Sequence, residues 1–314
     1  MNLRKLGSTG LMVSPLCFGT LTIGPVQRNF SPDKGAALIC QAYEAGVNFF
    51  DTAELYDTYK PLKIALRQHP DLIIAGRSYA ASKEEMRRSL DLARKQLDRD
   101  YIDIFGIHEL ENAASLKGHQ AALDYLTEAK SKGIIKGVEI STHYIAGVRA
   151  GATDPRIDII HPLINLDGIG IRDGSVNEMV EAIKTAKEFG KGIYAMKVLA
   201  GGHLIDKAAE AIRFIVDLDL VDSLAIGIQS ITELKINLAL INREPIPSEL
   251  SIVINQVKRT LEIASWCQGC GSCVEKCSFE ALSMVGNRPV VDQGKCVRCG
   301  YCARVCPEFC LKIV

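Results

Sequence analysis

The chain of 314 residues is near the size of a (β/α)8 barrel with a smaller module attached. Its 47% hydrophobic and 24% charged residues are typical of an ordinary globular protein and exclude wholesale disorder. Because 37 basic residues balance 37 acidic ones, the net charge offers no electrostatic case for binding nucleic acid or a membrane surface.

Short apolar runs bounded by turn residues alternate with helical patterns from Leu16 to about Arg243. This alternation is typical of βα units around a parallel sheet. The eight predicted strands are Leu16–Gly19, Val47–Phe50, Leu72–Ala75, Ile102–Ile107, Ile134–Ile140, Ile157–Ile160, Ile193–Met196 and Ser223–Ile228. Eight units predict an α/β fold in which residues 1–243 form a closed (β/α)8 TIM barrel. A capping box at Ser82-Lys-Glu-Glu85 predicts that one helix begins there.

Polar side chains follow the predicted strands at the end where TIM-barrel enzymes carry their active sites. The residues at or just beyond these strand ends are Asp51, Arg77, His108, Ser141, His161 and Met196. Histidines 108, 143, 161 and 203 near the same rim raise the alternative of a mononuclear metal site. No H-x-x-x-H or H-x-H pair supports a metal, so binding of a small-molecule substrate is the preferred interpretation.

The periodicity stops near Glu244-Pro-Ile-Pro, and two prolines so close together indicate a linker. We expect a linker over 244–264 that includes a helical segment from about Ile252 to Ile263, followed by a second domain over 265–314. The alternative is one continuous domain whose tail packs against the barrel.

The cysteines are concentrated in this tail, since only Cys17 and Cys40 of the eleven precede it. No stretch resembles a signal peptide or a membrane span, so we expect a cytoplasmic protein. In that reducing compartment dense cysteines are more often ligands of a metal or cluster than partners in disulfides.

The tail repeats one cysteine motif, C-x2-C-x2-C-x3-C, and in such runs the fourth cysteine ligates the partner cluster. This predicts two 4Fe-4S clusters, one bound by Cys267, Cys270, Cys273 and Cys306 and the other by Cys277, Cys296, Cys299 and Cys302. Two zinc ribbons are the alternative, but they explain the third cysteine of each run poorly. Between the motifs we expect a β-hairpin that turns at Gly286-Asn287, and Cys310 is expected to be a buried free thiol.

The segment from Trp266 to Val314 resembles the bacterial two-cluster ferredoxins, although Ser278 stands where that family usually has proline. Gly7-Ser-Thr-Gly10, Gly46-Val-Asn-Phe-Phe-Asp-Thr-Ala-Glu-Leu-Tyr56 and Asp100-Tyr-Ile-Asp-Ile-Phe-Gly-Ile-His108 resemble the aldo-keto reductases. With Met196-Lys197 and Ala200-Gly-Gly202, the chain is most similar to the branch of that family with a C-terminal ferredoxin domain.

The resemblance implies a tyrosine that donates a proton to a carbonyl, an Asp–Lys pair that lowers the pKa of this tyrosine, and a histidine that orients the substrate. Asp51, Tyr56 and His108 match three of these residues, but Arg77 stands where the lysine should be. Arginine does not readily lose its proton and makes planar contacts, so the substitution weakens the case for hydride chemistry. Strand alternation places Glu139 on the inward face, and we expect it to pair with Arg77, because a lone buried carboxylate would be costly.

The resemblance also implies a nicotinamide nucleotide held by an amide-binding set and a ring-stacking residue. Ser141, Thr142 and His161 correspond to that set, and Met196 replaces the aromatic. The segment that begins with Gln229 and Ser230 lacks the cation expected for a 2′-phosphate. Binding of NADP(H), binding of NAD(H), binding of another substrate and binding of no nucleotide are therefore all open alternatives.

The leading interpretation is an iron-sulfur oxidoreductase that reduces a carbonyl or similarly activated small molecule. We expect Tyr56 as the acid, His108 as the orienting residue and Asp51 with Arg77 as the electrostatic pair. Clusters imply one-electron transfer to the substrate or exchange with an external ferredoxin-like donor or acceptor. The alternatives are an electron carrier or redox sensor whose barrel is a docking scaffold, and clusters that only attach the C-terminus to the barrel.

Overall fold

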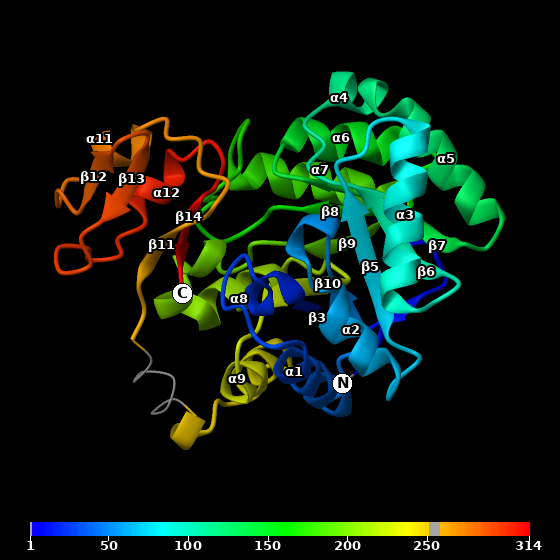
Figure 1. Ribbon diagram of the computed structural model, residues 1–314, viewed down its shortest axis with the longest axis horizontal. Helices are drawn as coiled ribbons and strands as arrows, with labels where there is room; N and C mark the ends of the chain where they lie inside the picture. The colour runs from blue at the N-terminus through cyan, green and yellow to red at the C-terminus, as the bar shows by residue number, and fades with distance from the viewer. Residues whose placement is uncertain (1, 251–257) are drawn as a thin grey trace.

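The computed structural model describes residues 2–250 and 258–314. Eight parallel strands close into a barrel in the order β10-β3-β4-β5-β6-β7-β8-β9 (Figure 1). They are β3 (Leu16–Gly19), β4 (Phe49–Asp51), β5 (Ile73–Ser78), β6 (Ile102–Ile107), β7 (Ile135–Thr142), β8 (Ile159–Pro162), β9 (Gly192–Ala195) and β10 (Ser223–Gly227). All eight predicted strands are confirmed, and β3 and β6 have the predicted bounds.

Helices surround this barrel and bury their apolar faces against the strands. They are α1 (Pro32–Glu44), α2 (Tyr59–Leu66), α3 (Lys83–Leu97), α4 (Ala113–Gly118), α5 (Gln120–Ser131), α6 (Ile145–Thr153), α7 (Val176–Glu188), α8 (Ala208–Asp217) and α9 (Ile231–Ile241). The predicted capping box is present, because the Ser82 side chain accepts from Glu85 N–H and the Glu85 side chain accepts from Ser82 N–H. Short 3-10 turns follow strands β3, β4 and β9. They are η1 (Thr20–Ile23) after β3, η2 (Glu54–Tyr56) after β4, and η3 (Ala200–Gly202) and η4 (Ile205–Lys207) after β9.

An N-terminal hairpin closes the bottom of the barrel, and the sequence patterns did not predict it. Its strands are β1 (Arg4–Lys5) and β2 (Met12–Val13). Leu6 and Leu11 of the hairpin are buried with inward-facing strand residues such as Phe49 and Ile104. Gly7 adopts φ +52° where a Cβ would overlap the backbone of Gly192. With this end filled, the opposite end, where the strands finish, is left for the site.

The tail contains two small antiparallel sheets and two short helices. Strand β11 (Leu261–Ile263) pairs with β14 (Leu311–Ile313), and β12 (Leu282–Val285) pairs with β13 (Arg288–Val291). The helices are α11 (Ser272–Glu275) and α12 (Tyr301–Arg304). The hairpin predicted at Gly286-Asn287 is confirmed.

The helix predicted from about Ile252 to Ile263 is wrong where it can be compared. Residues 251–257 lie outside the described residues, and Leu261–Ile263 is strand β11. This strand exists because it pairs with β14 near the C-terminus, and a local pattern carries no information about so distant a partner.

The tail packs against the barrel loops that follow β8 and β9 (Figure 1). Ile169, Ala200 and Leu204 of the barrel share one apolar cluster with Phe309 and Ile313 of the tail. Polar contacts join the same surfaces, since Nε2 of His203 lies 3.0 Å from Leu311 O and Nη2 of Arg304 lies 3.3 Å from Oδ2 of Asp167. No helix among the described residues is long and apolar enough to cross a membrane.

Candidate functional site

A buried ionic network lies inside the barrel below its mouth. Arg77 is 1% exposed, and its Nε donates to Oε1 of Glu139 at 2.7 Å. Its Nη2 forms an ion pair with Oδ1 of Asp51 and donates to the hydroxyl of Tyr194 at 2.9 Å. The predicted pairing of Glu139 with Arg77 is confirmed. Two buried carboxylates need a positive charge beside them. The guanidinium supplies it and binds each carboxylate through a different nitrogen.

Tyr194 belongs to this network and was missed from the sequence. Its hydroxyl donates to Oε2 of Glu139, and burial raises the pKa of this phenol well above its usual value. The signal that would have found it is strand alternation, because Tyr194 lies two residues before Met196 and therefore shares its face.

His161 lines the cavity and is fixed against Tyr194. The two rings stack with centroids 3.8 Å apart, and Nδ1 of His161 lies 2.5 Å from Tyr194 O. Because a carbonyl only accepts, Nδ1 carries the proton and Nε2 is left as an acceptor, 3.7 Å from Oδ1 of Asp51. Burial, and then Arg77, hold the pKa of His161 well below its usual value, so the ring is neutral.

The rim above the network carries an aromatic group formed by Tyr56, Tyr79 and His108. The ring of His108 stacks on Tyr79 at 4.4 Å and meets Tyr56 edge-on at 5.9 Å. Burial, followed by Arg77, lowers the pKa of His108 well below its usual value, which keeps this imidazole neutral. His108 and Tyr56 are thus brought together as the sequence suggested.

The pKa of Tyr56 is raised, whereas the family resemblance implies that an Asp–cation pair, here Asp51 and Arg77, lowers it. Burial raises the pKa of this half-buried phenol, and the charge of Glu109 raises it further. In the described part of the chain, the phenol that Arg77 contacts is Tyr194, not Tyr56. The reason is that Arg77 is held by Asp51 and Glu139 below the rim.

The residues expected to bind a nicotinamide nucleotide are only partly assembled. The Ser141 hydroxyl accepts from Glu109 N–H at 3.0 Å, and the Thr142 hydroxyl accepts from Tyr144 N–H at 3.0 Å. Ser230 caps α9 by accepting from Glu233 N–H at 3.2 Å. These three oxygens therefore support loops and a helix end.

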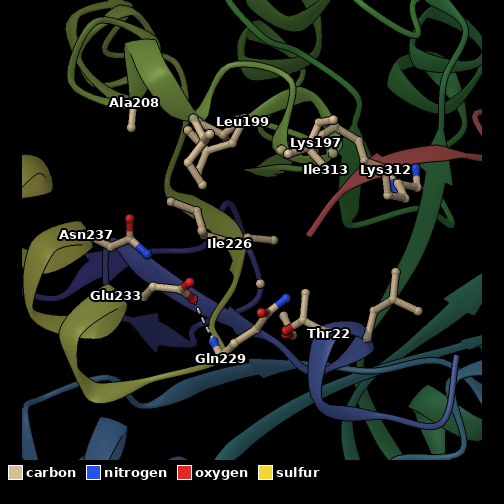
Figure 2. A pocket seen from close by; sticks show the side chains of 18 of the residues that line it. Thr22, Lys197, Leu199, Ala208, Ile226, Gln229, Glu233, Asn237, Lys312 and Ile313 are labelled. Atoms are coloured by element: carbon tan, nitrogen blue, oxygen red, sulfur yellow. Dashed lines mark hydrogen bonds between the residues drawn. The ribbon is translucent and has the colours of Figure 1, made fainter. Parts of the chain in front are cut away.

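A cavity of about 380 Å³ opens at the mouth of the barrel (Figure 2). Asp51, Tyr56, His161 and Met196 line it nearest the network. At its far end lie Gln229, Glu233 and Asn237, where Gln229 N–H donates to Oε2 of Glu233 at 2.8 Å. The tail completes the wall with Lys312, Ile313 and Val314. Gly202, at φ +93°, allows this, because a Cβ there would overlap Ile313 O.

The eight motif cysteines surround two small cavities in the tail. Cys267, Cys270, Cys273 and Cys306 line one of them, together with Cys310, and Cys277, Cys296, Cys299 and Cys302 line the other. These are the two predicted sets of four. Each fourth cysteine accepts a backbone N–H, since Ala281 N lies 3.3 Å from Sγ of Cys277 and Cys310 N lies 3.2 Å from Sγ of Cys306.

This arrangement has the features that a cluster site needs. Backbone N–H groups directed at sulfur stabilise a thiolate and tune a bound cluster. Gly271 and Gly300 precede α11 and α12 at matching places in the two motifs, with φ of +81° and +79°. Cys310 is buried, as expected, and occupies the place in the second motif that Ala281 has in the first.

Sequence comparison relates both parts of the chain to known families. Residues 15–210 match the aldo/keto reductase family, and residues 288–309 match a 4Fe-4S binding domain. An L-galactose dehydrogenase of Arabidopsis thaliana is 27% identical over 227 residues, which cover 66% of this chain and 68% of the plant protein. A 6-dehydroglucose reductase of Novosphingobium aromaticivorans is 26% identical over 183 residues, covering 49% and 59% of the two chains.

Solved structures agree with this assignment of the barrel. A Pseudomonas aeruginosa structure proposed to be an aldo-keto reductase is 25% identical, with a TM-score of 0.66 over 77% of this chain and 94% of that one. An aldo-keto reductase from Bacillus halodurans has the same TM-score at 20% identity, over 82% and 96% of the two chains, and shows the fold alone.

Proposed function

The chain belongs to the aldo/keto reductase family and carries a 4Fe-4S binding domain, and we propose that it reduces a small molecule at the barrel mouth with electrons from two clusters. The substrate group is a carbonyl or a similarly activated bond. One observation carries the proposal: the C-terminal segment that supplies Cys306 continues through β14 and forms a wall of the barrel cavity. The electron-transfer part and the substrate cavity therefore share one short segment.

The two four-cysteine sets are the residues that would hold the clusters. Each set surrounds its own cavity, and each includes a sulfur that accepts a backbone N–H. When bound, such clusters supply and accept single electrons. We propose a one-electron donor of the ferredoxin class as the external source.

Reduction of a carbonyl to an alcohol consumes two electrons and two protons. The rim residues can supply the proton that goes to the oxygen, and water that enters the cavity supplies the proton that goes to the carbon. The raised pKa of Tyr56 keeps its phenol protonated, so it donates a hydrogen bond to the carbonyl oxygen. As that oxygen gains negative charge, it becomes basic enough to take the phenol proton. The neutral imidazole of His108, held between Tyr79 and Tyr56, orients the same oxygen.

The buried network supports this chemistry without exchanging protons. Burial opposes the charged form of Arg77, but Tyr194 and Glu139 raise the pKa of the guanidinium, so it stays charged between Asp51 and Glu139. Where a nicotinamide nucleotide also enters the cavity, Glu233 favours NAD(H), because its carboxylate can accept from a ribose hydroxyl and repels a 2′-phosphate. NAD(H) is therefore a secondary electron source in this proposal.

The test is reoxidation of the reduced holoprotein by candidate substrates. Protein reduced anaerobically with dithionite would be mixed with small aldehydes, ketones and 2-oxo acids, while the visible absorbance of the clusters is followed. We expect one of these classes to reoxidise the protein with saturation and to yield the alcohol. Tyr56→Phe is expected to slow this reaction about 100-fold or more. Tyr43→Phe, on α1 away from the mouth, is the matched control and leaves the rate unchanged.

Two results would contradict the proposal. The first is a Tyr56→Phe variant that reacts as fast as the unaltered protein. The second is a protein whose clusters are reduced reversibly but which no carbonyl compound reoxidises. That result would favour an electron carrier or redox sensor whose barrel is a docking scaffold. NADH and NADPH added in place of dithionite show whether either nucleotide reduces the clusters.

A further inference from the structure

Lys312 is a buried cation at the junction of tail and barrel. Its side chain is 4% exposed and lines the barrel cavity from strand β14 (Figure 2). Among residues 2–250 and 258–314, its Nζ has no hydrogen-bond partner. A buried ammonium without a partner is costly, so a group that enters the cavity is needed to compensate it.

A second cation lies beside it. Lys197 follows β9, and its Nζ is 5.4 Å from the centroid of the Phe309 ring, while Nζ of Lys312 is 3.6 Å from the same centroid. Both lysines line the cavity. Burial lowers the pKa of each, and for Lys312 the charge of Lys197 lowers it further. The lowered pKa values mean that burial disfavours the charged form of both lysines, so an anion that binds beside them is favoured because it restores their protonated forms.

The side-chain carboxylates that line the cavity are Asp51, Asp206 and Glu233, and within residues 2–250 and 258–314 none of them forms an ion pair with either lysine. Glu109 is largely exposed and lies 3.9 Å from His143, with no ion pair to either lysine in the described part of the chain. Asp51 lines the cavity but is committed to Arg77. Its carboxylate repels an anion, so a bound molecule would direct its anionic end away from the network and toward the lysines.

We propose that Lys312 and Lys197 bind an oxyanion group of the substrate, a carboxylate or a phosphate, at the tail side of the cavity. This inference rests on the proposed function, because it describes the molecule that is reduced at the same mouth. It makes the tail part of the substrate site as well as the carrier of the cluster cysteines. It also selects acidic carbonyl compounds, such as 2-oxo acids or sugar phosphates, over neutral ones.

The experiment measures binding to the oxidised holoprotein by calorimetry, so that no turnover is needed. Oxalate probes a carboxylate site, inorganic phosphate probes a phosphate site, and ADP-ribose probes a nucleotide diphosphate. We expect oxalate or phosphate to bind, and Lys312→Met to weaken that binding at least tenfold, which is about 1.4 kcal/mol. Lys312→Arg retains most of the affinity. Lys295→Met removes the same charge from an exposed position in the tail and is the matched control.

Four outcomes would overturn the inference. In the first, oxalate and phosphate bind Lys312→Met as tightly as the unaltered protein, and in the second Lys295→Met weakens their binding as much as Lys312→Met does. Alternatively, only ADP-ribose binding falls, in which case the lysines serve a nucleotide. A Lys312→Met variant that changes the cluster reduction potential but not oxyanion binding would make Lys312 a counter-ion of the cluster at Cys306.

Two further arms keep the result decisive. If Lys312→Met does not fold, Lys197→Met is measured in its place, with the same expected loss and the same contradicting results. Oxyanion binding that depends on Lys312, in a protein that no carbonyl compound reoxidises, would support this site and contradict the proposed reduction. Reoxidation by neutral aldehydes without oxyanion binding would support the proposed reduction and contradict this site.

Discussion

Arg77 illustrates how one substitution in the barrel interior requires others. A lysine places a single charge, whereas a guanidinium offers several donors in a plane and needs acceptors for them. Glu139 and Asp51 accept from different nitrogens, and the Tyr194 hydroxyl bridges toward Glu139. The arginine, the extra glutamate and the tyrosine therefore form one unit, and its effect is to keep the cation away from Tyr56.

Removing the cation is the sharpest test of this unit. We expect Arg77→Met to lower the free energy of unfolding by about 3–5 kcal/mol, because it leaves two buried carboxylates without their partner. Glu139→Gln costs less, since Asp51 still balances the guanidinium. Urea unfolding of the holoprotein, followed by circular dichroism, gives both values.

The control removes an arginine whose ion pairs are exposed. Arg87→Met on α3 breaks contacts with Glu84 and Asp91 at the surface and is expected to change stability little. Equal losses for Arg77→Met and Arg87→Met would show that the buried network contributes nothing specific.

At the scale of single residues, the sequence predicted those site features that follow from alternation along one strand. The inward direction of Glu139, and hence its pairing with Arg77, could be deduced in this way. Tyr194 follows the same rule, but a tyrosine in an apolar strand also suits a hydrophobic core. Its residue type therefore did not indicate that it belongs to a polar network. The pKa of Tyr56 could not be predicted, because it depends on which of several partners Arg77 contacts.

Among the structural elements, the loops around the cysteines depend on glycine at defined places. Gly269 lies between Cys267 and Cys270 at φ +72°, and a Cβ there would overlap the carbonyl oxygen of Asn287 in the β12–β13 turn. Gly271 has a similar φ of +81°, but nothing lies within 4 Å of its added Cβ. An alanine at either position would therefore have the same backbone strain, but only at Gly269 would its Cβ also overlap a neighbouring atom.

We therefore expect Gly269→Ala to impair the first cluster site more than Gly271→Ala does. The unaltered holoprotein should hold about eight irons per chain, and the Gly269→Ala variant should fall toward about four as that site is lost. Iron and sulfide analysis after anaerobic reconstitution measures this. Equal iron content in the two alanine variants would mean that the turn at Asn287 moves away without cost.

The elements themselves were predictable to the extent that they are local. Each barrel strand is a short apolar run followed by a helical pattern, and the eightfold repetition of this unit indicated closure. The pairing of β11 with β14 joins segments about fifty residues apart, so no periodicity reveals it. The β1–β2 hairpin is two residues per strand and equally lacks a pattern.

In the whole molecule, the C-terminal residues of the tail form part of the wall of the barrel cavity. Ile313 and Val314 line the cavity, and the loop after β9 holds the tail through His203 and through the close approach at Gly202. A 4Fe-4S binding domain this small is expected to draw much of its stability from the bound iron. On the proposed function, we therefore expect the shape of the cavity to be coupled to the clusters.

This coupling predicts the effect of removing the iron. Oxidative removal of the clusters in the presence of a chelator should speed hydrogen exchange in residues 261–314 and also in the barrel loop at 199–205, because that loop loses its packing partners. Hydrogen-exchange mass spectrometry measures both segments. Helix α5 lies on the far side of the barrel and should keep its protection, as should the barrel strands (Figure 1). If 199–205 stays protected while 261–314 opens, the cavity wall is held by the barrel alone, and the tail would contribute cysteines but no structure to the substrate site.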